Sequence, residues 1–185
     1  MVRPTDQHTL LCKSNVLFLG YSPPTPNELE LRALSEPLRK AYPPVQNLNE
    51  IEGINAYVTI FSSGIQLQHV DGRDPLVFWF PIQNLYLAAA NKCVTYYNSA
   101  GEITESKFVE LSKPEAQNNS HAPLFSFISQ ISGGSEMQAY TFMTKSDAAA
   151  FALVEAAKTA YEDKSGHVEG RIPSEVSSYY LLDVC

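Results

Sequence analysis

Cysteine and basic residues are scarce in this chain. Its 185 residues include 3 cysteines and 13 lysines and arginines against 20 aspartates and glutamates, for a net charge of −7. The odd count and wide spacing of the cysteines argue against a disulfide framework or a zinc site and indicate reduced intracellular thiols. The acidic balance disfavours nucleic acid and anionic membranes as main partners, because both require clustered Lys and Arg.

Long apolar runs are missing as well. No stretch approaches the roughly 18 apolar residues of a membrane span, and the N-terminal sequence lacks a basic segment followed by an apolar one. The apolar fraction of 44% nevertheless allows a full hydrophobic core. We therefore expect a soluble protein of the cytoplasm that does not insert into membranes.

The sequence also lacks a convergent set of catalytic groups. The 4 histidines lie in unrelated contexts, and no two of them have metal-ligand spacing. There is no Gly-rich phosphate loop, nucleophile elbow or Cys-x-x-Cys motif. We expect a non-catalytic protein that uses no metal and no cofactor.

The clearest positive pattern lies between Pro123 and Asp163. Residues 123–130 and 137–144 have the alternation and aromatic content of two strands. The residues between them include Ser132-Gly133-Gly134-Ser135, which favours a hairpin turn. Ser146 can cap an Ala-rich helix about 27 Å long that ends near Asp163. The pattern predicts strand, hairpin, strand and a long helix.

The preceding sequence predicts more strands and one helical segment. An apolar run at 16–21 predicts the first strand, and residues 27–42 have helical spacing that Pro37 interrupts, which predicts a break or two short helices. Residues 55–90 alternate with period two around turn residues, as in an antiparallel meander. Residues 91–122 predict an extra hairpin or extended strands, followed by a loop.

In this order, the motifs resemble the phosphotyrosine-binding or phosphotyrosine-interaction (PTB/PID) domain family, a branch of the pleckstrin-homology-like superfold. The resemblance covers residues 14–163, and the segment 91–122 departs from it because the family has only a short connection there. It implies an α+β fold: a bent antiparallel β-sandwich of about seven strands, capped by a C-terminal α-helix, with a helical insertion after the first strand. The motifs that match are Phe18-Leu19-Gly20, Ser62-Ser63-Gly64-Ile65-Gln66-Leu67, Ile82-Gln83-Asn84-Leu85-Tyr86, Phe125-Ser126-Phe127-Ile128 and Ala160-Tyr161.

We accordingly divide the chain into three parts. Residues 1–13 are expected to form a flexible N-terminal lead. Residues 14–163 form the PTB/PH-like domain, with the insertion at 91–122, and residues 164–185 form a C-terminal tail.

The resemblance implies an adaptor that binds an extended peptide, often of Asn-Pro-x-Tyr type, by adding it as a strand to an open sheet edge against the C-terminal helix. By this resemblance the strand from Phe125 to Gln130 offers the edge. Packing against the sheet is the alternative role for Phe151 and Val154. The candidate peptide-binding residues are Phe125, Ser126, Phe127, Ile128, Ser129, Gln130, Phe151, Val154, Lys158 and Tyr161.

Binding is expected to be independent of phosphotyrosine. A phosphate is normally bound by Arg side chains, and none of the arginines lies in the two strands before the long helix, where only Lys145 is near. The expected partner is a cytoplasmic tail or another linear peptide. Two alternatives stay open: a pleckstrin-homology-type module for phosphoinositides, disfavoured by the lack of Lys and Arg in the first hairpin, and a scaffold subunit whose groove is closed by its own insertion or tail.

The tail contains one short motif. Tyr179-Tyr180-Leu181-Leu182 fits the Tyr-x-x-Φ sorting pattern, with Tyr179 and Leu182 as its defining positions, and resembles signals read by clathrin adaptors. It suggests a role in signalling or endocytosis. A chance match or a packed tail is the alternative interpretation.

Overall fold

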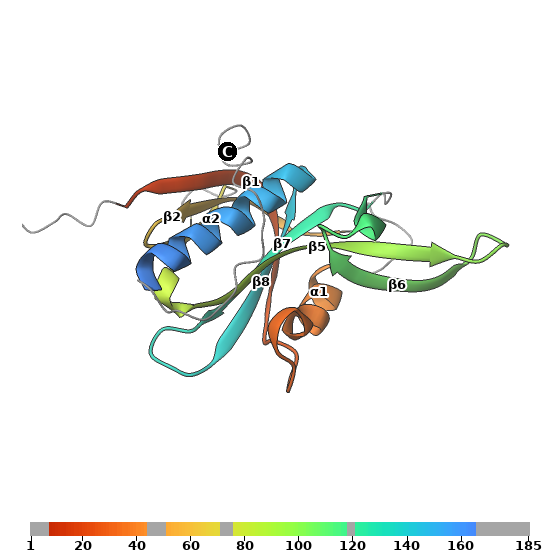
Figure 1. Cartoon of the computed structure of the whole chain (residues 1–185), viewed down its shortest axis with the longest axis horizontal. Coiled ribbons are helices and arrows are strands. Elements are labelled where there is room, and N and C mark those ends of the chain that lie inside the picture. The colour runs from red at the N-terminus through yellow and green to blue at the C-terminus, as the bar shows by residue number, and fades with distance from the viewer. Residues whose placement is uncertain (1–7, 44–50, 71–75, 118–120, 166–185) are drawn as a thin grey trace, which may run out of the picture.

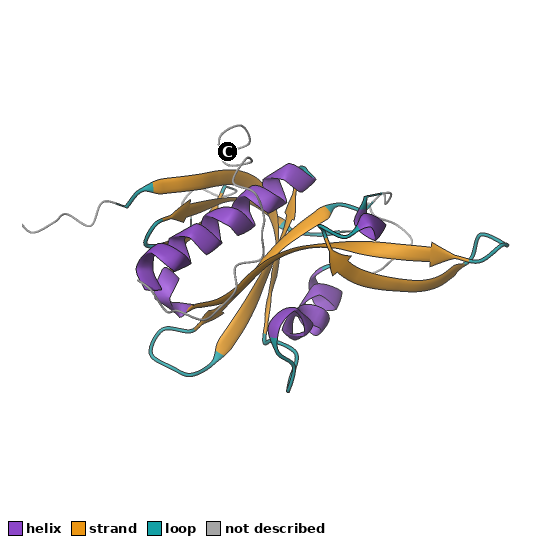
Figure 2. Ribbon diagram, viewed as in Figure 1, coloured by secondary structure: helices purple, strands orange, loops and turns teal. Residues whose placement is uncertain are grey.

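The computed structural model describes residues 8–43, 51–70, 76–117 and 121–165. These residues form one antiparallel sheet of 8 strands in the order β4-β3-β2-β1-β8-β7-β5-β6, with α1 and α2 on opposite faces (Figures 1 and 2). The predicted PTB-like α+β fold is confirmed. The strands are β1 (Leu10–Ser22), β2 (Ile54–Phe61), β3 (Gly64–His69), β4 (Val77–Pro81), β5 (Leu85–Tyr97), β6 (Ile103–Glu110), β7 (Pro123–Gln130) and β8 (Met137–Thr144). The helical elements are η1 (Glu30–Leu34), α1 (Ser35–Ala41), η3 (Ile82–Asn84), η4 (Pro114–Ala116) and α2 (Asp147–Ser165).

Helix α2 begins where the sequence places it. The backbone N–H of Ala149 donates a 3.1 Å hydrogen bond to Ser146 Oγ, which satisfies one of the amides that a helix start leaves unpaired. The alanines that face the sheet are fully buried, and because they are small they allow α2 to lie close to it. The helix ends at Ser165, close to the expected end.

The sheet is buried on both faces by different helices. On the α2 face, Phe125, Phe127 and Phe142 form an aromatic layer against the helix. On the opposite face, Leu124 and Ile128 pack with the residues of η1 and α1. Because successive side chains of a strand point to opposite faces, β7 contributes to both cores, and seven of its eight residues are buried.

Three details differ from the sequence-based expectation or refine it. The sheet has 8 strands instead of about seven, because the insertion extends β5 to Tyr97 and adds β6, and these two strands project from the body as an arm (Figure 1). Strand β1 begins at Leu10, inside the segment expected to be a flexible lead. The helical segment forms two short elements, which is one of the two expected outcomes. Element η1 passes directly into α1, and Pro37 lies in the first turn of α1, where a proline is tolerated, and not at the junction.

The Cys93 thiol is free and buried. In the part of the chain that the structure describes, no helix has the length and apolar character needed to cross a membrane.

Candidate functional site

The prediction that Phe125–Gln130 presents an open sheet edge is wrong. Strand β7 pairs with β8 on one side and with β5 on the other, from Pro123 to Gln130. Its amides are therefore committed to the sheet, and a peptide cannot add there. The error has a physical reason: the sequence suggests which residues form strands, but the partner of β7 is a strand that ends more than 20 residues earlier in the sequence, across the insertion.

The open edge near α2 belongs to β5 instead. Its inner edge pairs with β7 from Leu85 to Lys92, whereas its outer edge pairs with β6 only from Asn91 onward. Among the described residues, no strand pairs with the outer edge from Leu85 to Ala89. The insertion thus covers half of β5 and leaves the other half open. We call this half, residues 85–89, the β5 half-edge.

The direction of the free main-chain groups follows from one hydrogen bond. The Leu111 N–H donates to the Ala90 carbonyl at 3.0 Å, so the amide groups of Ala90 face outward, toward β6. Because the amide groups of alternate residues in a strand point the same way, the N–H and C=O of Ala88 also face outward. Those of Ala89 face β7, where Ala89 is paired with Ser126. The β5 half-edge therefore offers Ala88 as a donor and acceptor for an added strand.

One face of α2 borders this half-edge. Phe151, Val154, Lys158 and Tyr161 recur at helical spacing and share that face, as predicted. Phe151 packs on the base of the β5–β6 arm and Val154 belongs to the core under α2, so both have the packing role that the sequence leaves as the alternative. Lys158 is half-buried, and Tyr161 is exposed.

The candidate residues on β7 have structural partners. Phe125, Phe127 and Ile128 are buried in the two cores. The Ser126 hydroxyl is 3.3 Å from Thr141 Oγ1 across the β7–β8 pair, and Gln130 Nε2 donates to the Gly134 carbonyl at 2.6 Å. Ser129 is buried, and its hydroxyl lies 3.4 Å from the Asn84 carbonyl.

An ion pair joins the middle of β5 to the start of α2. Lys92 Nζ lies 3.1 Å from Asp147 Oδ1, which ties the middle of β5 to the first turn of α2. The Lys92 side chain is nearly inaccessible, so this pair is more than a surface contact. The other end of α2, near η3, has no such bridge among the described residues.

A buried polar cluster anchors the insertion to the domain. His121 Nδ1 is 2.9 Å from the Tyr42 hydroxyl, and His121 Nε2 is 2.8 Å from Thr95 Oγ1. Burial lowers the pKa of His121, and the charge of Lys92 lowers it further. Burial also raises the pKa of Tyr42. The cluster therefore favours a neutral imidazole and holds the start of β7 against α1 and the arm.

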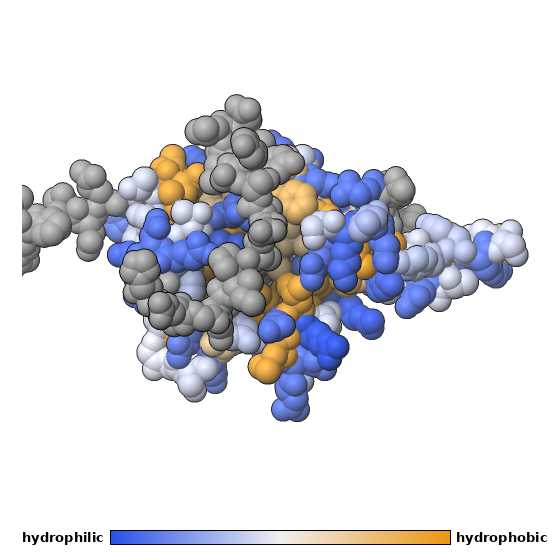
Figure 3. All heavy atoms as spheres, in the orientation of Figure 1, coloured by the Kyte–Doolittle hydropathy of each residue, from blue (hydrophilic) through white to orange (hydrophobic). Residues whose placement is uncertain are grey.

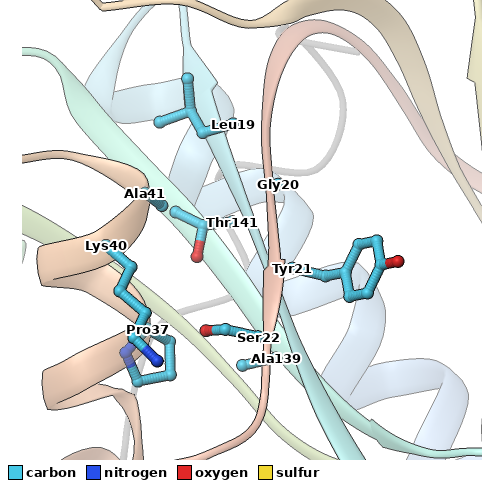
Figure 4. Close-up of a pocket in the computed structure, with 9 residues that line it drawn as sticks. All are labelled: Leu19, Gly20, Tyr21, Ser22, Pro37, Lys40, Ala41, Ala139 and Thr141. Carbon is cyan, nitrogen blue, oxygen red and sulfur yellow. The ribbon is translucent and has the colours of Figure 1, made fainter.

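The cavities lie away from the β5 half-edge. A cavity of about 100 Å³ lies between α1 and the strands β1 and β8, where Lys40, Ser22 and Thr141 contribute polar groups (Figure 4). It is smaller than ordinary small-molecule sites and is lined by no residue of β5 or α2. The tail motif at Tyr179 and Leu182 lies outside the described residues.

Comparison with known proteins supports the fold. No protein-family model and no curated protein sequence matches the chain. Among solved structures, it is similar to the solution structure of the C-terminal phosphotyrosine interaction domain of APBB2 from mouse, with a TM-score of 0.52 and 15% sequence identity, over 92% of this chain and 97% of that one. At this level of identity, the similarity establishes a PTB-like fold.

Proposed function

We propose that this chain is a protein-interaction domain that binds an extended peptide as an added strand on the β5 half-edge, alongside α2. The observation that carries the proposal is the outer edge from Leu85 to Ala89, with which no strand of the described residues pairs, on a strand that contacts α2, the helix that exposes Tyr161. Main-chain hydrogen bonds to an open edge give affinity for any extended peptide, and side-chain contacts give specificity.

The half-edge also defines the size of the ligand. Five residues of strand span about 16 Å, so the added strand has a core of about five residues. Beyond Ala90 the outer edge is occupied by β6 and its continuation at Leu111. The peptide therefore continues toward η3 and Tyr161, where an aromatic side chain is available to pack on a turn of Asn-Pro-x-Tyr type.

The charges beside the groove favour a ligand without a phosphate. On the α2 face, Lys158 is the cation, and its Nζ lies 3.9 Å from Glu155, which partly neutralises it. The described arginines, Arg32 and Arg39, belong to η1 and α1 on the other side of the sheet. Phosphorylation of a ligand tyrosine is expected to change the affinity less than about tenfold. The partner is a linear segment of another protein, such as a cytoplasmic tail, and the domain acts as an adaptor in the cytoplasm.

A pair of proline variants tests the site. Ala88→Pro removes an outward N–H and leaves the ladder with β7 intact, so it is expected to weaken peptide binding tenfold or more, since an unpaired acceptor costs about 1–3 kcal/mol. Ala89→Pro is the matched control one residue away, and because it removes an inward N–H it is expected to destabilise the fold. Peptides selected from a random display library supply the ligands, and titration calorimetry together with thermal unfolding gives the measurements.

Tyr161→Ala tests the helix side of the groove. The ring is exposed, so the fold is expected to tolerate the change, while binding weakens by about 1–3 kcal/mol if the ring anchors the peptide. The proposal fails if selected peptides bind Ala88→Pro and Tyr161→Ala as tightly as the unmodified protein, with both variants folded. Amide chemical shifts that change elsewhere than at β5 and α2 on peptide addition also reject it.

A further inference from the structure

The opposite end of the sheet is an open edge of a different kind. Strand β4 is the last strand on that side, and in the described part of the chain it pairs only with β3. Leu76, Val77, Phe78 and Trp79 are four consecutive apolar residues with exposed fractions of 57%, 51%, 44% and 42%. Among the described residues, each of these four side chains keeps at least two-fifths of its surface exposed. We call residues 76–79 the β4 edge.

Two hydrogen bonds establish which groups of the β4 edge are free. The His69 N–H donates to the Leu76 carbonyl, and the Ile82 N–H donates to the Ser63 carbonyl, so residues 76 and 82 face β3. By alternation the amide groups of Phe78 face β3, whereas those of Val77 and Trp79 face outward. Pro81 also has its ring nitrogen on the outward side, where the missing N–H costs no bond with β3. The free groups are therefore two N–H donors and two C=O acceptors.

Trp79 is held in a defined position on this edge. Its indole lies across the backbone of Gly64, where an added Cβ would meet Trp79 Cζ2 at 2.6 Å. The rings of His8 and Phe61 flank it at centroid distances of 5.9 and 6.0 Å. On the other face, the Phe78 ring lies 5.4 Å from the ring of His69. Both aromatic side chains are thus ordered before any partner arrives.

The β4 edge has no charged residue and no bulge, which are two of the features that normally keep sheet edges apart. Edge strands of soluble proteins carry charged residues, bulges or interior prolines that prevent pairing with other strands. Strand β6, at the other end of the sheet, follows this rule with Glu105, Lys107 and Glu110, and the arm that contains it is largely hydrophilic in Figure 3. Strand β4 has no charged residue, no register shift against β3, and a proline only at its end.

We propose that the β4 edge binds the β4 edge of a second copy of this chain, as an antiparallel pair that joins two sheets across a two-fold axis. With Phe78 at the axis, Val77 of one copy lies opposite Trp79 of the other, and their outward amides form two hydrogen bonds on each side of the axis. One copy thus satisfies all four free groups of the other.

The side chains of the pair also match a second copy. Around a two-fold axis each side chain meets the same strand of the other copy, so any charge on the strand would face a like charge. The β4 edge is uncharged although the chain has a net charge of −7, and the pair places aromatic and aliphatic side chains opposite each other on both faces. Burial of the exposed apolar surface is limited to roughly 300–400 Å² per copy, which corresponds to a weak, concentration-dependent dimer.

This association uses main-chain groups other than those of the proposed peptide site. In the hydrogen-bonding order of the sheet, the β4 edge and the β5 half-edge are separated by β3, β2, β1, β8 and β7. In the chain, however, η3 joins β4 directly to β5, and the Phe80 ring lies 5.1 Å from that of Phe127 on β7, so the sheet curves back toward β4. Because Val77 and Phe78 lie at the end of β4 that is away from η3, a dimer through β4 keeps one proposed peptide site on each copy, which is a bivalent arrangement.

The chain contains a built-in reporter of this contact. Trp79 is its only tryptophan, so the fluorescence of the protein reports directly on the β4 edge. Between about 1 and 500 μM, sedimentation equilibrium is expected to show the average mass rising from that of a monomer toward that of a dimer, with a parallel blue shift of the emission. Both signals must change over the same concentration range.

Val77→Lys and Val77→Pro test the mechanism. The lysine places like charges near the axis, and the proline removes an outward N–H without affecting the bonds to β3, so each is expected to raise the dimer dissociation constant at least about tenfold. The control is Thr104→Lys, at an exposed position of β6, and the protein with this change is expected to dimerise as the unmodified protein does. Circular dichroism checks that all variants are folded.

Three results would overturn the proposal. The first is a protein that stays monomeric over the whole concentration range. The second is a dimer that Val77→Lys and Val77→Pro leave intact, and the third is a dimer that forms with no change in Trp79 emission. Peptide affinity measured on the same samples separates this proposal from the peptide-binding proposal, since Val77→Lys is expected to bind peptides as the unmodified protein does.

Discussion

The two outer strands of the sheet, β4 and β6, differ in the side chains that they present at the exposed edge. Strand β6 carries three charged side chains, Glu105, Lys107 and Glu110. Lys107 forms an ion pair with Glu115 at 3.6 Å and lies 5.2 Å above the Tyr96 ring. Strand β4 exposes aliphatic and aromatic side chains on both faces and has no charge. Charged edges resist pairing with other strands, whereas uncharged flat ones invite it. The charges of β6 therefore protect that end of the sheet, whereas the uncharged β4 is the edge through which we propose self-association.

The pairing of β6 also determines the position of the proposed peptide site. By pairing with β5 from Asn91 onward, β6 covers part of the edge that would otherwise run the full length of β5. What is left is the half-edge from Leu85 to Ala89 beside α2. The insertion therefore shortens the open edge of β5, and it also supplies β6, the charged outer strand.

The largest effect is expected in the core that both edges share. Phe142→Ala removes a fully buried ring that stacks on Phe125 and Phe127, and it should lower the free energy of unfolding by about 3–5 kcal/mol. Urea unfolding measures the loss. Both edges should lose function together, because their strands depend on one core. A variant that loses peptide binding but keeps native stability would show instead that Phe142 acts at the site.

A smaller loss of stability is expected from Ser129→Pro on the central strand. Ser129 is paired with Gln138 of β8 and with Leu85 of β5, so proline removes a ladder bond in the interior and leaves a buried acceptor unpaired, at a cost of about 1–3 kcal/mol. Thermal unfolding measures this cost. The comparison is with Val77→Pro on β4, where the lost N–H faces outward. Equal stability of these two variants would contradict the assignment of central and outer strands.

The charges of β6 can be removed to make it resemble β4. The double change Glu105→Val and Lys107→Val should create a second associating edge and lower the dissociation constant for self-association at least about tenfold, or about 1.4 kcal/mol. The measurement is sedimentation in a Val77→Lys background, which removes association through β4. Association that stays unchanged would show that charge is not what protects the β6 end.

The smallest expected effect is a pH dependence of the free energy of unfolding that comes from His121. Because burial lowers the pKa of His121, its neutral form stabilises the fold, and this contribution is fully present above the unfolded value of about 6.5 and is lost as pH falls toward the folded pKa. Unfolding free energies measured between about pH 8 and 5 should therefore decrease on the acidic side. His121→Gln keeps hydrogen-bonding groups near Tyr42 and Thr95 and should remove that part of the decrease. An unchanged pH profile in the variant would assign it to other groups.

The sequence by itself determined most of the secondary structure and the fold class. The Ser146 cap and the run of alanines predicted α2, and the turn residues predicted the β2–β3 and β7–β8 hairpins. The helical spacing around Pro37 predicted a break or two short helices; η1 and α1 are two short elements, although Pro37 lies inside α1 and not between them. These features depend on local spacing and on residues that are close in the chain. Their order along the chain was sufficient to predict a PTB-like fold.

Only the tertiary structure decided which strand edge is open. Strand β7 has the aromatic pattern of a binding strand, but it is enclosed by β8 and by β5, whose residues Leu85–Lys92 precede it by more than 30 positions. Likewise, the sequence of β5 does not show that its pairing with β6 begins only at Asn91. The sequence of β4 does not show that the amides of Val77 and Trp79 face outward. The alternation of apolar and polar residues along a strand shows which face is buried, because buried positions favour apolar side chains. Hydrogen-bond pairing uses the main chain, which is the same at every residue, so the edges become visible only when the strands are placed in space.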